Sequence, residues 1–140
     1  MISIENDVIN YIGNKVRAAH EGADVAGTYV QAPSTFPHVS IVESDNRVFD
    51  RMRTIKIENA AVSLIEINIY SNKASGKKQE AIAIANTVDE GMEEIGYTRT
   101  FRNPIPNLND ASIYRIVCRY EAIIGRGSDG KFLVYQSNYI

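Results

Sequence analysis

The stretch "INIYSNKASGKKQEAIAIANTVDE", residues 67–90, changes its hydrophobic period midway, and this change decides the fold class. Before the change, Ile67 and Ile69 alternate with polar residues, which is typical of a half-buried β-strand. After it, apolar residues recur every three or four positions, which predicts a helix over about 76–95 that ends at Gly96. The apolar stripe of this helix consists of Ala81, Ile84, Ala85, Val88, Met92 and Ile95. A strand and an amphipathic helix therefore follow one another directly.

The order strand, loop, Gly-Lys, helix is also that of a nucleotide-binding P-loop. Such a loop needs G-x-x-x-x-G-K-[ST], because its backbone N–H groups wrap the phosphates and its hydroxyl binds the magnesium ion. Here Ser71 stands at the first glycine position and Lys78 at the hydroxyl position. We therefore expect no nucleotide binding and interpret the loop as a helix start with Ser75 as its N-cap. Lys77 and Lys78 oppose the dipole of that helix, which suggests a role outside local stability.

Upstream of this stretch, the pattern predicts a helix and several strands. The nearest strand covers 60–71, with Ile65, Ile67 and Ile69 on its buried face. Residues 44–59 give weak signals and are interpreted as a loop followed by a strand near 53–57. The other elements are strands over 27–31 and 38–43 and a helix over 4–19, with Ile4, Val8, Tyr11, Ile12, Val16 and Ala19 on one stripe.

Downstream, a strand at 97–105 is followed by a turn-rich connection and by a long alternating strand over 112–124. Residues 125–130 are predicted to form a hairpin turn, and residues 131–136 the returning strand. One side of the long strand carries Tyr114, Ile116, Cys118, Tyr120, Ala122 and Ile124, and the other carries Arg115, Val117, Arg119 and Glu121.

These elements predict one α+β domain over residues 1–140. It has a mainly antiparallel sheet, two helices packed on one face and a long C-terminal β-hairpin. The long strand would span about 43 Å, more than a domain of this size covers. Apolar residues also occur on the face that the helices leave open, namely Val62, Leu64, Val117 and Ile123. We therefore expect the hairpin of residues 112–136, with unpaired backbone groups, to meet another subunit rather than water.

The composition is that of an ordinary globular chain, with 44% hydrophobic residues, 23% charged residues and a net charge of −2. This charge argues against dedicated nucleic-acid binding. The sequence has neither an apolar run of about eighteen residues nor a signal-peptide pattern. We therefore expect that the protein does not associate with a membrane and that it assembles in the cytoplasm. The single Cys118 excludes an internal disulfide and a cysteine zinc cluster.

No pattern in the sequence indicates an enzyme. His20 and His38 lack a third ligand at metal-site spacing, so a metal site is not expected. Cys118 lies within an alternating apolar strand and is interpreted as a small buried hydrophobe rather than a nucleophile. The carboxylates of the second helix, Asp89, Glu90, Glu93 and Glu94, are interpreted as a solvated face. We expect no catalytic residue, no cofactor and no metal.

A basic cluster is the charge feature that stands out. It consists of Arg47, Arg51, Arg53 and Lys56. Two interpretations are open: a solvated segment balanced by Asp45, Asp50 and Glu58, or contact with an acidic partner surface or with DNA. In the second interpretation, Phe49 and Met52 supply the apolar anchors.

Three segments of the C-terminal half, "YSNKASGKKQEA" (70–81), "VDEGMEEIGYTR" (88–99) and "NPIPNLNDASIYRIVCRY" (103–120), carry a likeness to a known family. They resemble small phage and prophage proteins called minor capsid, tail completion or tail terminator proteins. The resemblance covers about 55 of the 140 residues, and its motifs are structural rather than catalytic.

The resemblance implies a structural virion protein of the head–tail junction, assembled in the host cytoplasm. Such proteins form a six-membered ring that caps the tail tube, ends its polymerisation and offers a docking surface to neck or connector proteins, while DNA passes through the channel without specific binding. In that setting, the candidate ring interface comprises Lys73, Lys77, Lys78, Arg115, Val117, Arg119 and Glu121. The candidate arm that contacts the tube or an adjacent subunit comprises Arg47, Phe49, Arg51, Met52, Arg53 and Lys56.

Two alternatives stay open. One is a neck or head-completion protein, that is, a head–tail connector, which works in the same assembly. The other is a ferredoxin-like module that binds a small ligand, because two helices on an antiparallel sheet serve many functions.

Overall fold

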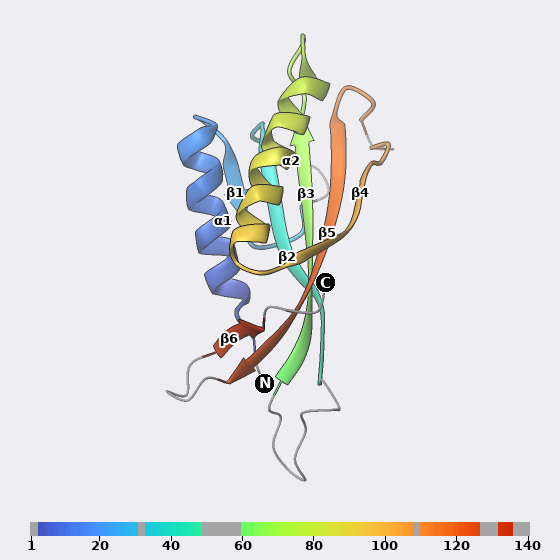
Figure 1. Cartoon of the computed structure of the whole chain (residues 1–140). Coiled ribbons are helices and arrows are strands. Elements are labelled where there is room, and N and C mark those ends of the chain that lie inside the picture. Colours follow the sequence, from blue (N-terminus) through green and yellow to red (C-terminus); the bar gives the residue numbers. More distant parts are fainter. Residues whose placement is uncertain (1–2, 31–32, 49–59, 108–109, 127–131, 136–140) are drawn as a thin grey trace.

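The computed structural model describes residues 3–30, 33–48, 60–107, 110–126 and 132–135. Its elements are two helices, α1 (Glu5–Ala19) and α2 (Lys77–Glu94), and the strands β1 (Asp24–Ala26), β2 (His38–Val48), β3 (Ala60–Ser71), β4 (Thr98–Pro104), β5 (Tyr114–Arg126) and β6 (Phe132–Tyr135) (Figure 1). The strands form one sheet in the order β1-β2-β3-β5-β4, with β6 paired to β5. All neighbours are antiparallel except β1 and β2. The predicted α+β class is confirmed.

Both helices lie on the same face of the sheet, as predicted (Figure 1). The alternation of β3 places Ile65, Ile67 and Ile69 beneath them, and all three are fully buried. The helices contribute Val8, Ile12, Val16, Ala81, Ile84, Ala85, Val88 and Met92 to the same core. Burial of these side chains is the main source of stability for such a fold.

A glycine sets the distance between the two helices. A Cβ atom at Gly91 of α2 would lie 2.7 Å from Cδ1 of Ile12 and 2.9 Å from Cδ of Lys15, both in α1. Glycine costs about 1 kcal/mol of helix propensity relative to alanine. The close approach of α1 explains why the chain has a glycine at this position.

Strand β5 lies inside the sheet rather than at its edge. It pairs with β3 over Tyr114–Gly125, and its other side pairs first with β4 and then with β6. The hairpin of β5 and β6 pairs over four residues of β5, Ile123–Arg126. The predicted strand is therefore present. The prediction that the hairpin offers unpaired backbone groups is wrong for β5, whose two sides pair with β3, β4 and β6, whereas β6 pairs with β5 alone among the described strands.

The face without helices is also less open than predicted. Val117 and Val62 have exposed fractions of 1% and 5%, whereas Leu64 and Ile123 are half-buried. Val117 lies between Asn68 of β3 and Asn103 of β4 in the strand register, so polar neighbours flank it on both sides. Val117 is thus a buried residue and not an exposed apolar contact.

Two predicted boundaries at the N-terminal side of the sheet are wrong. Residues 27–30 are not a strand; β1 precedes them and pairs in parallel with the start of β2. The β-branched and aromatic residues Thr28, Tyr29 and Val30 suggested a strand, but this segment leads out of the sheet, where Ser40 Oγ donates a hydrogen bond to the Thr28 carbonyl at 2.7 Å. Strand β2 continues to Val48 after a register shift between Glu43 and Asp45, where a loop was predicted. The strand predicted near 53–57 lies outside the described residues.

Candidate functional site

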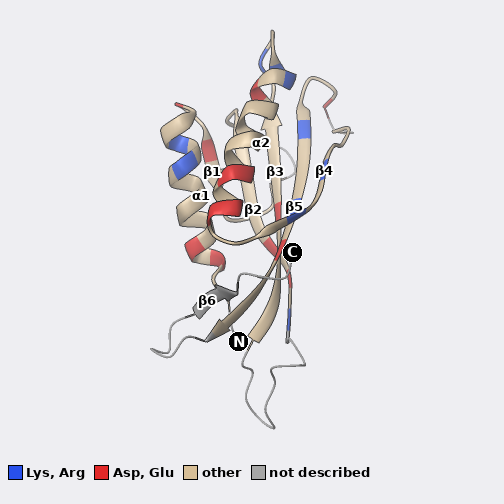
Figure 2. Ribbon diagram, in the orientation of Figure 1, with Lys and Arg blue, Asp and Glu red and all other residues tan. Residues whose placement is uncertain are grey.

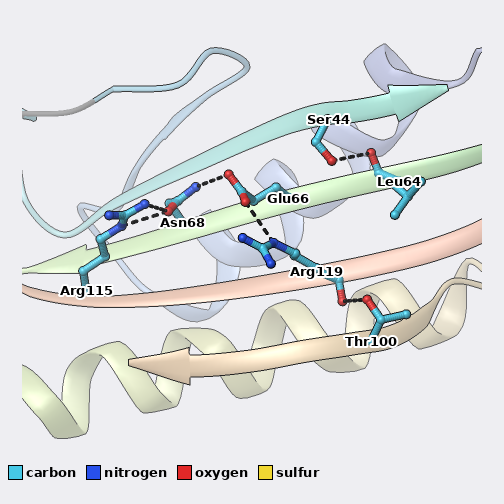
Figure 3. A network of polar contacts seen from close by, with 7 residues as sticks. All are labelled: Ser44, Leu64, Glu66, Asn68, Thr100, Arg115 and Arg119. Carbon is cyan, nitrogen blue, oxygen red and sulfur yellow. Dashed lines mark hydrogen bonds and ion pairs between the residues drawn. The ribbon is translucent and has the colours of Figure 1, made fainter. Parts of the chain in front are cut away.

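A chain of polar contacts crosses the face of the sheet that carries no helices (Figure 3). Arg115 donates from Nε and Nη2 to Oδ1 of Asn68 at 3.0 and 2.7 Å. Asn68 Nδ2 donates to Glu66 Oε2 at 3.3 Å, and Arg119 Nε donates to Glu66 Oε1 at 3.1 Å. Strands β3 and β5 place these four residues on one face because each contributes alternate positions. We call these four residues the charged strip.

The two guanidinium groups of the charged strip also lie against aromatic rings. The Arg119 guanidinium carbon is 4.7 Å from the ring centre of Phe101 in β4, and that of Arg115 is 5.8 Å from the ring centre of Tyr70. Such contacts contribute about 0.5–1 kcal/mol at exposed sites. Burial also raises the pKa of Tyr70 to about 12. The arginines are therefore held in place although the Arg119 side chain is 47% exposed.

Arg47, at the end of β2, extends this charged surface. Its guanidinium lies 3.8 Å from Glu121 Oε1 of β5 and 3.6 Å from Asp45 Oδ2. The structure thus places one residue of the predicted arm on the same face as Arg115, Arg119 and Glu121 of the predicted interface. The other arm residues, Phe49, Arg51, Met52, Arg53 and Lys56, lie outside the described residues.

The three lysines of the predicted interface gather elsewhere, in the β3–α2 loop and the first turn of α2 (Figure 2). Lys77 Nζ donates to the Ser112 carbonyl at 3.2 Å. Lys73 and Lys78 are exposed, and their side chains make no hydrogen bond or ion pair within the described part of the chain. The lysines and the charged strip are therefore separate surfaces.

The loop before α2 differs from the predicted cap. Gly76, not Ser75, is the N-cap, with a left-handed φ of +90° that glycine adopts without strain. Ser71 Oγ donates to Glu80 Oε1 at 2.7 Å. A carboxylate therefore lies beside the serine that stands at the first glycine position of a P-loop, where it would repel a phosphate.

The histidines and the cysteine take structural positions. His20 Nε2 lies 2.8 Å from Thr87 Oγ1 and links the two helices, and His38 Nδ1 lies 2.9 Å from Asp24 Oδ2. Cys118 is fully buried, and this burial raises the pKa of its thiol to about 11. Among the described residues, no group of three or more His, Cys, Asp or Glu could hold a metal ion. No helix in the described part of the chain is long and apolar enough to cross a membrane.

A cleft of about 290 Å³ lies between the end of α2 and β4. Asp89 at its wall accepts a hydrogen bond from the Tyr120 hydroxyl at 3.1 Å and pairs with Arg99 at 3.3 Å. Burial raises the pKa of Tyr120 well above its ordinary value. Asp89 therefore binds residues of β4 and β5. The prediction that it belongs to a solvated face is wrong for this residue.

The charged strip was only partly visible in the sequence. Arg115 and Arg119 were predicted to share a face. Asn68 alternates with Ile67 and Ile69 and so falls on the opposite face of the predicted strand, yet it is fully buried. The sequence signal for the strip was an even spacing in each strand. Glu66 and Asn68 are two positions apart in one strand, and Arg115 and Arg119 are four positions apart in the other, so each pair shares a face. Which residues face each other depends on the β3–β5 register, and that register is a tertiary property.

Comparisons with known proteins show the fold. No protein-family model matches the sequence, and no curated protein matches it. Among solved structures, the chain is similar to one described as "Virion of native gene transfer agent (GTA) particle", with a TM-score of 0.56 and 15% sequence identity. The match covers 81% of this chain and 91% of that chain. The two chains therefore share an architecture over most of their lengths.

Proposed function

We propose that the chain is a structural protein of a phage-like virion and acts at the head–tail junction. The observation that carries this proposal is the fold that it shares with a chain of the gene transfer agent virion, over 81% of this chain. The motifs of residues 70–120, which resemble those of tail terminator proteins, support the same class.

In this proposal, six copies form a ring on the last layer of the tail tube. A tube grows by heterologous contacts that never close along its axis. A ring with one face that matches the tube and one that does not therefore ends growth without catalysis. The face turned away from the tube docks neck or connector proteins, and DNA passes through the channel.

The charged strip suits a contact between two ordered protein surfaces. A surface ion pair such as that of Arg119 and Glu66 contributes about 0–1 kcal/mol to stability, so this pair adds little to folding. The arginines of the strip are already held by Asn68, Glu66 and Phe101, which lowers the side-chain entropy lost on binding. Guanidinium groups fixed in this way favour a partner that offers carboxylates in a plane.

The test is a choice between two binding targets. Purified protein is mixed with assembled tail tubes and, separately, with DNA-filled heads that lack tails, and each mixture is sedimented. We expect the protein to sediment with tubes and not with heads. Binding to heads alone would instead identify a head-completion protein, and binding to neither target would contradict the proposed class.

Two variants make this test specific. Arg119→Ser removes a cation from the charged strip, whereas Arg17→Ser removes an exposed cation from α1, on the opposite face of the sheet. The first variant should bind tubes more weakly, and the second should bind like the parent protein.

A further inference from the structure

Helix α2 carries most of its charges against its own dipole. Its first turn contains Lys77 and Lys78 with one acidic residue, Glu80, its last turn contains no basic residue, and its last two turns contain Asp89, Glu90, Glu93 and Glu94. A helix dipole favours the opposite arrangement by about 0.3–1 kcal/mol for each charge. Local helix stability therefore does not explain this distribution.

Some of these charges have partners inside the molecule. Asp89 binds Tyr120 and Arg99, and Glu94 binds Lys15 at 2.8 Å and the Tyr11 hydroxyl at 3.1 Å. Lys77 is held by the Ser112 carbonyl. These contacts account for three of the six charges that oppose the dipole and leave Lys78, Glu90 and Glu93.

The remaining acidic pair is Glu90 and Glu93. The Glu90 side chain is 70% exposed and lies 3.7 Å from Lys15, and the exposed Glu93 carboxylate has no hydrogen bond or ion pair to the described residues. The basic pair is Lys78 and the exposed Lys73, which precedes the helix in the β3–α2 loop. We call Lys73 and Lys78 the lysine end, and Glu90 and Glu93 the glutamate end.

Lys78, Glu90 and Glu93 lie on the exposed side of α2, and Lys73 precedes the helix in the β3–α2 loop. Lys78 and Glu93 are fifteen residues apart, which places them about 60° apart around the helix axis and about 22 Å apart along it. The exposed residues between them include Ala83 and Asn86, which carry no charge. Figure 2 shows blue residues only at the start of α2, where one acidic segment lies beside them, and further acidic residues toward its end. The exposed side of α2 and the loop before it thus present a positive patch at one end and a negative patch at the other.

We propose that the lysine end of one copy of this chain binds the glutamate end of the next copy. The charge complementarity of the two patches selects a second copy as the partner, because each copy supplies both halves of the contact. Such a contact is heterologous, so it repeats from copy to copy and closes into a ring when its rotation allows. This contact would be an interface between subunits of the proposed ring. Only its biological setting rests on the proposed function.

A nucleic acid fits this face less well. The lysine end would attract phosphates, but the glutamate end on the same face would repel the continuing backbone. Contacts between opposite charges also fix the orientation of two proteins and weaken as salt rises. Self-association through α2 should therefore be favoured by low salt.

The test reverses the charges of each end. The first variant is Lys73→Glu with Lys78→Glu, the second is Glu90→Lys with Glu93→Lys, and the third combines all four changes. Sedimentation velocity at low salt measures self-association. The self-association of each double variant should be weaker than that of the parent protein by about tenfold or more, because like charges then face each other. An equimolar mixture of the two double variants, and the fourfold variant alone, should both regain association.

The controls separate this contact from folding and from function. Circular dichroism should show that each variant keeps the fold, since all four residues are exposed. Double variants that associate like the parent protein, a fourfold variant as weak as the doubles, or a parent protein that stays monomeric at millimolar concentration would each overturn the contact. If association is restored but the protein binds no tail tubes, the proposed function fails and the contact stands.

Discussion

Asn68 and Arg115 are joined across β3 and β5 by two hydrogen bonds that share one acceptor, Asn68 Oδ1, at 3.0 and 2.7 Å. Asn68 is fully buried, and its amide nitrogen binds Glu66 in turn. One buried amide therefore fixes an arginine on one side and a carboxylate on the other. This arrangement makes the charged strip a rigid surface rather than a set of mobile side chains.

The first prediction concerns this amide. Asn68→Ala should lower the free energy of unfolding by about 1–3 kcal/mol, because it removes a buried amide and leaves the half-buried Arg115 guanidinium without its acceptor. Urea denaturation followed by circular dichroism measures the change. Asn103→Ala is the matched control, since Asn103 faces the other side of Val117 and is exposed. Equal effects of the two substitutions would show that the buried amide has no special role.

The second prediction concerns the contact between the helices. Gly91→Ala should lower the free energy of unfolding by about 1–3 kcal/mol, because the new Cβ overlaps the buried Ile12 side chain. Gly13→Ala in α1 is the control. There a Cβ would lie 3.1 Å from Nη1 of Arg17, an exposed side chain with one 3.5 Å hydrogen bond to Asn14, and 3.4 Å from Cγ1 of Val25, so alanine should be tolerated or should stabilise the helix. Thermal unfolding of both variants tests this pair, and a stabilised Gly91→Ala variant would refute it.

Helix and strand periods explain which parts of the fold the sequence could predict. Strand β3 has the predicted bounds and α2 differs by about one residue at each end, because Ile65, Ile67 and Ile69 and the stripe from Ala81 to Met92 meet one apolar core. Strand β1 was misplaced because its three residues carry no alternation, and parallel pairing with β2 defines it. Burial of Val117 and Asn68 depends on neighbours in other strands, which a single strand pattern does not contain.

The third prediction is that the Gly-Lys loop binds no nucleotide. Titration calorimetry with ATP or GTP and magnesium should show no saturable binding below millimolar concentration. The physical reasons are the missing hydroxyl at Lys78 and the Glu80 carboxylate, which Ser71 holds beside the loop. Binding that is lost on Lys77→Ala would falsify this prediction.

The fourth prediction concerns the arm that begins at Arg47. A ring of six subunits with four arm cations each would put about two dozen positive charges around a channel, and each neutralised phosphate would slow the passage of DNA. We therefore expect the arm to contact the tube or an adjacent subunit. Changing Arg47, Arg51 and Arg53 together to Ser should abolish tube capping and leave duplex affinity unchanged. If the variant still caps tubes but its DNA binding depends less on salt, the proposed contact of the arm with the tube or an adjacent subunit is wrong.

The central claim is that this chain ends the growth of a tail tube as a ring. Electron microscopy of tube subunits polymerising with and without the protein tests it most directly. The account predicts tubes of limited length, each closed at one end by a single ring of six copies. Tubes that keep growing in the presence of the folded protein, with no added density at either end, would contradict it.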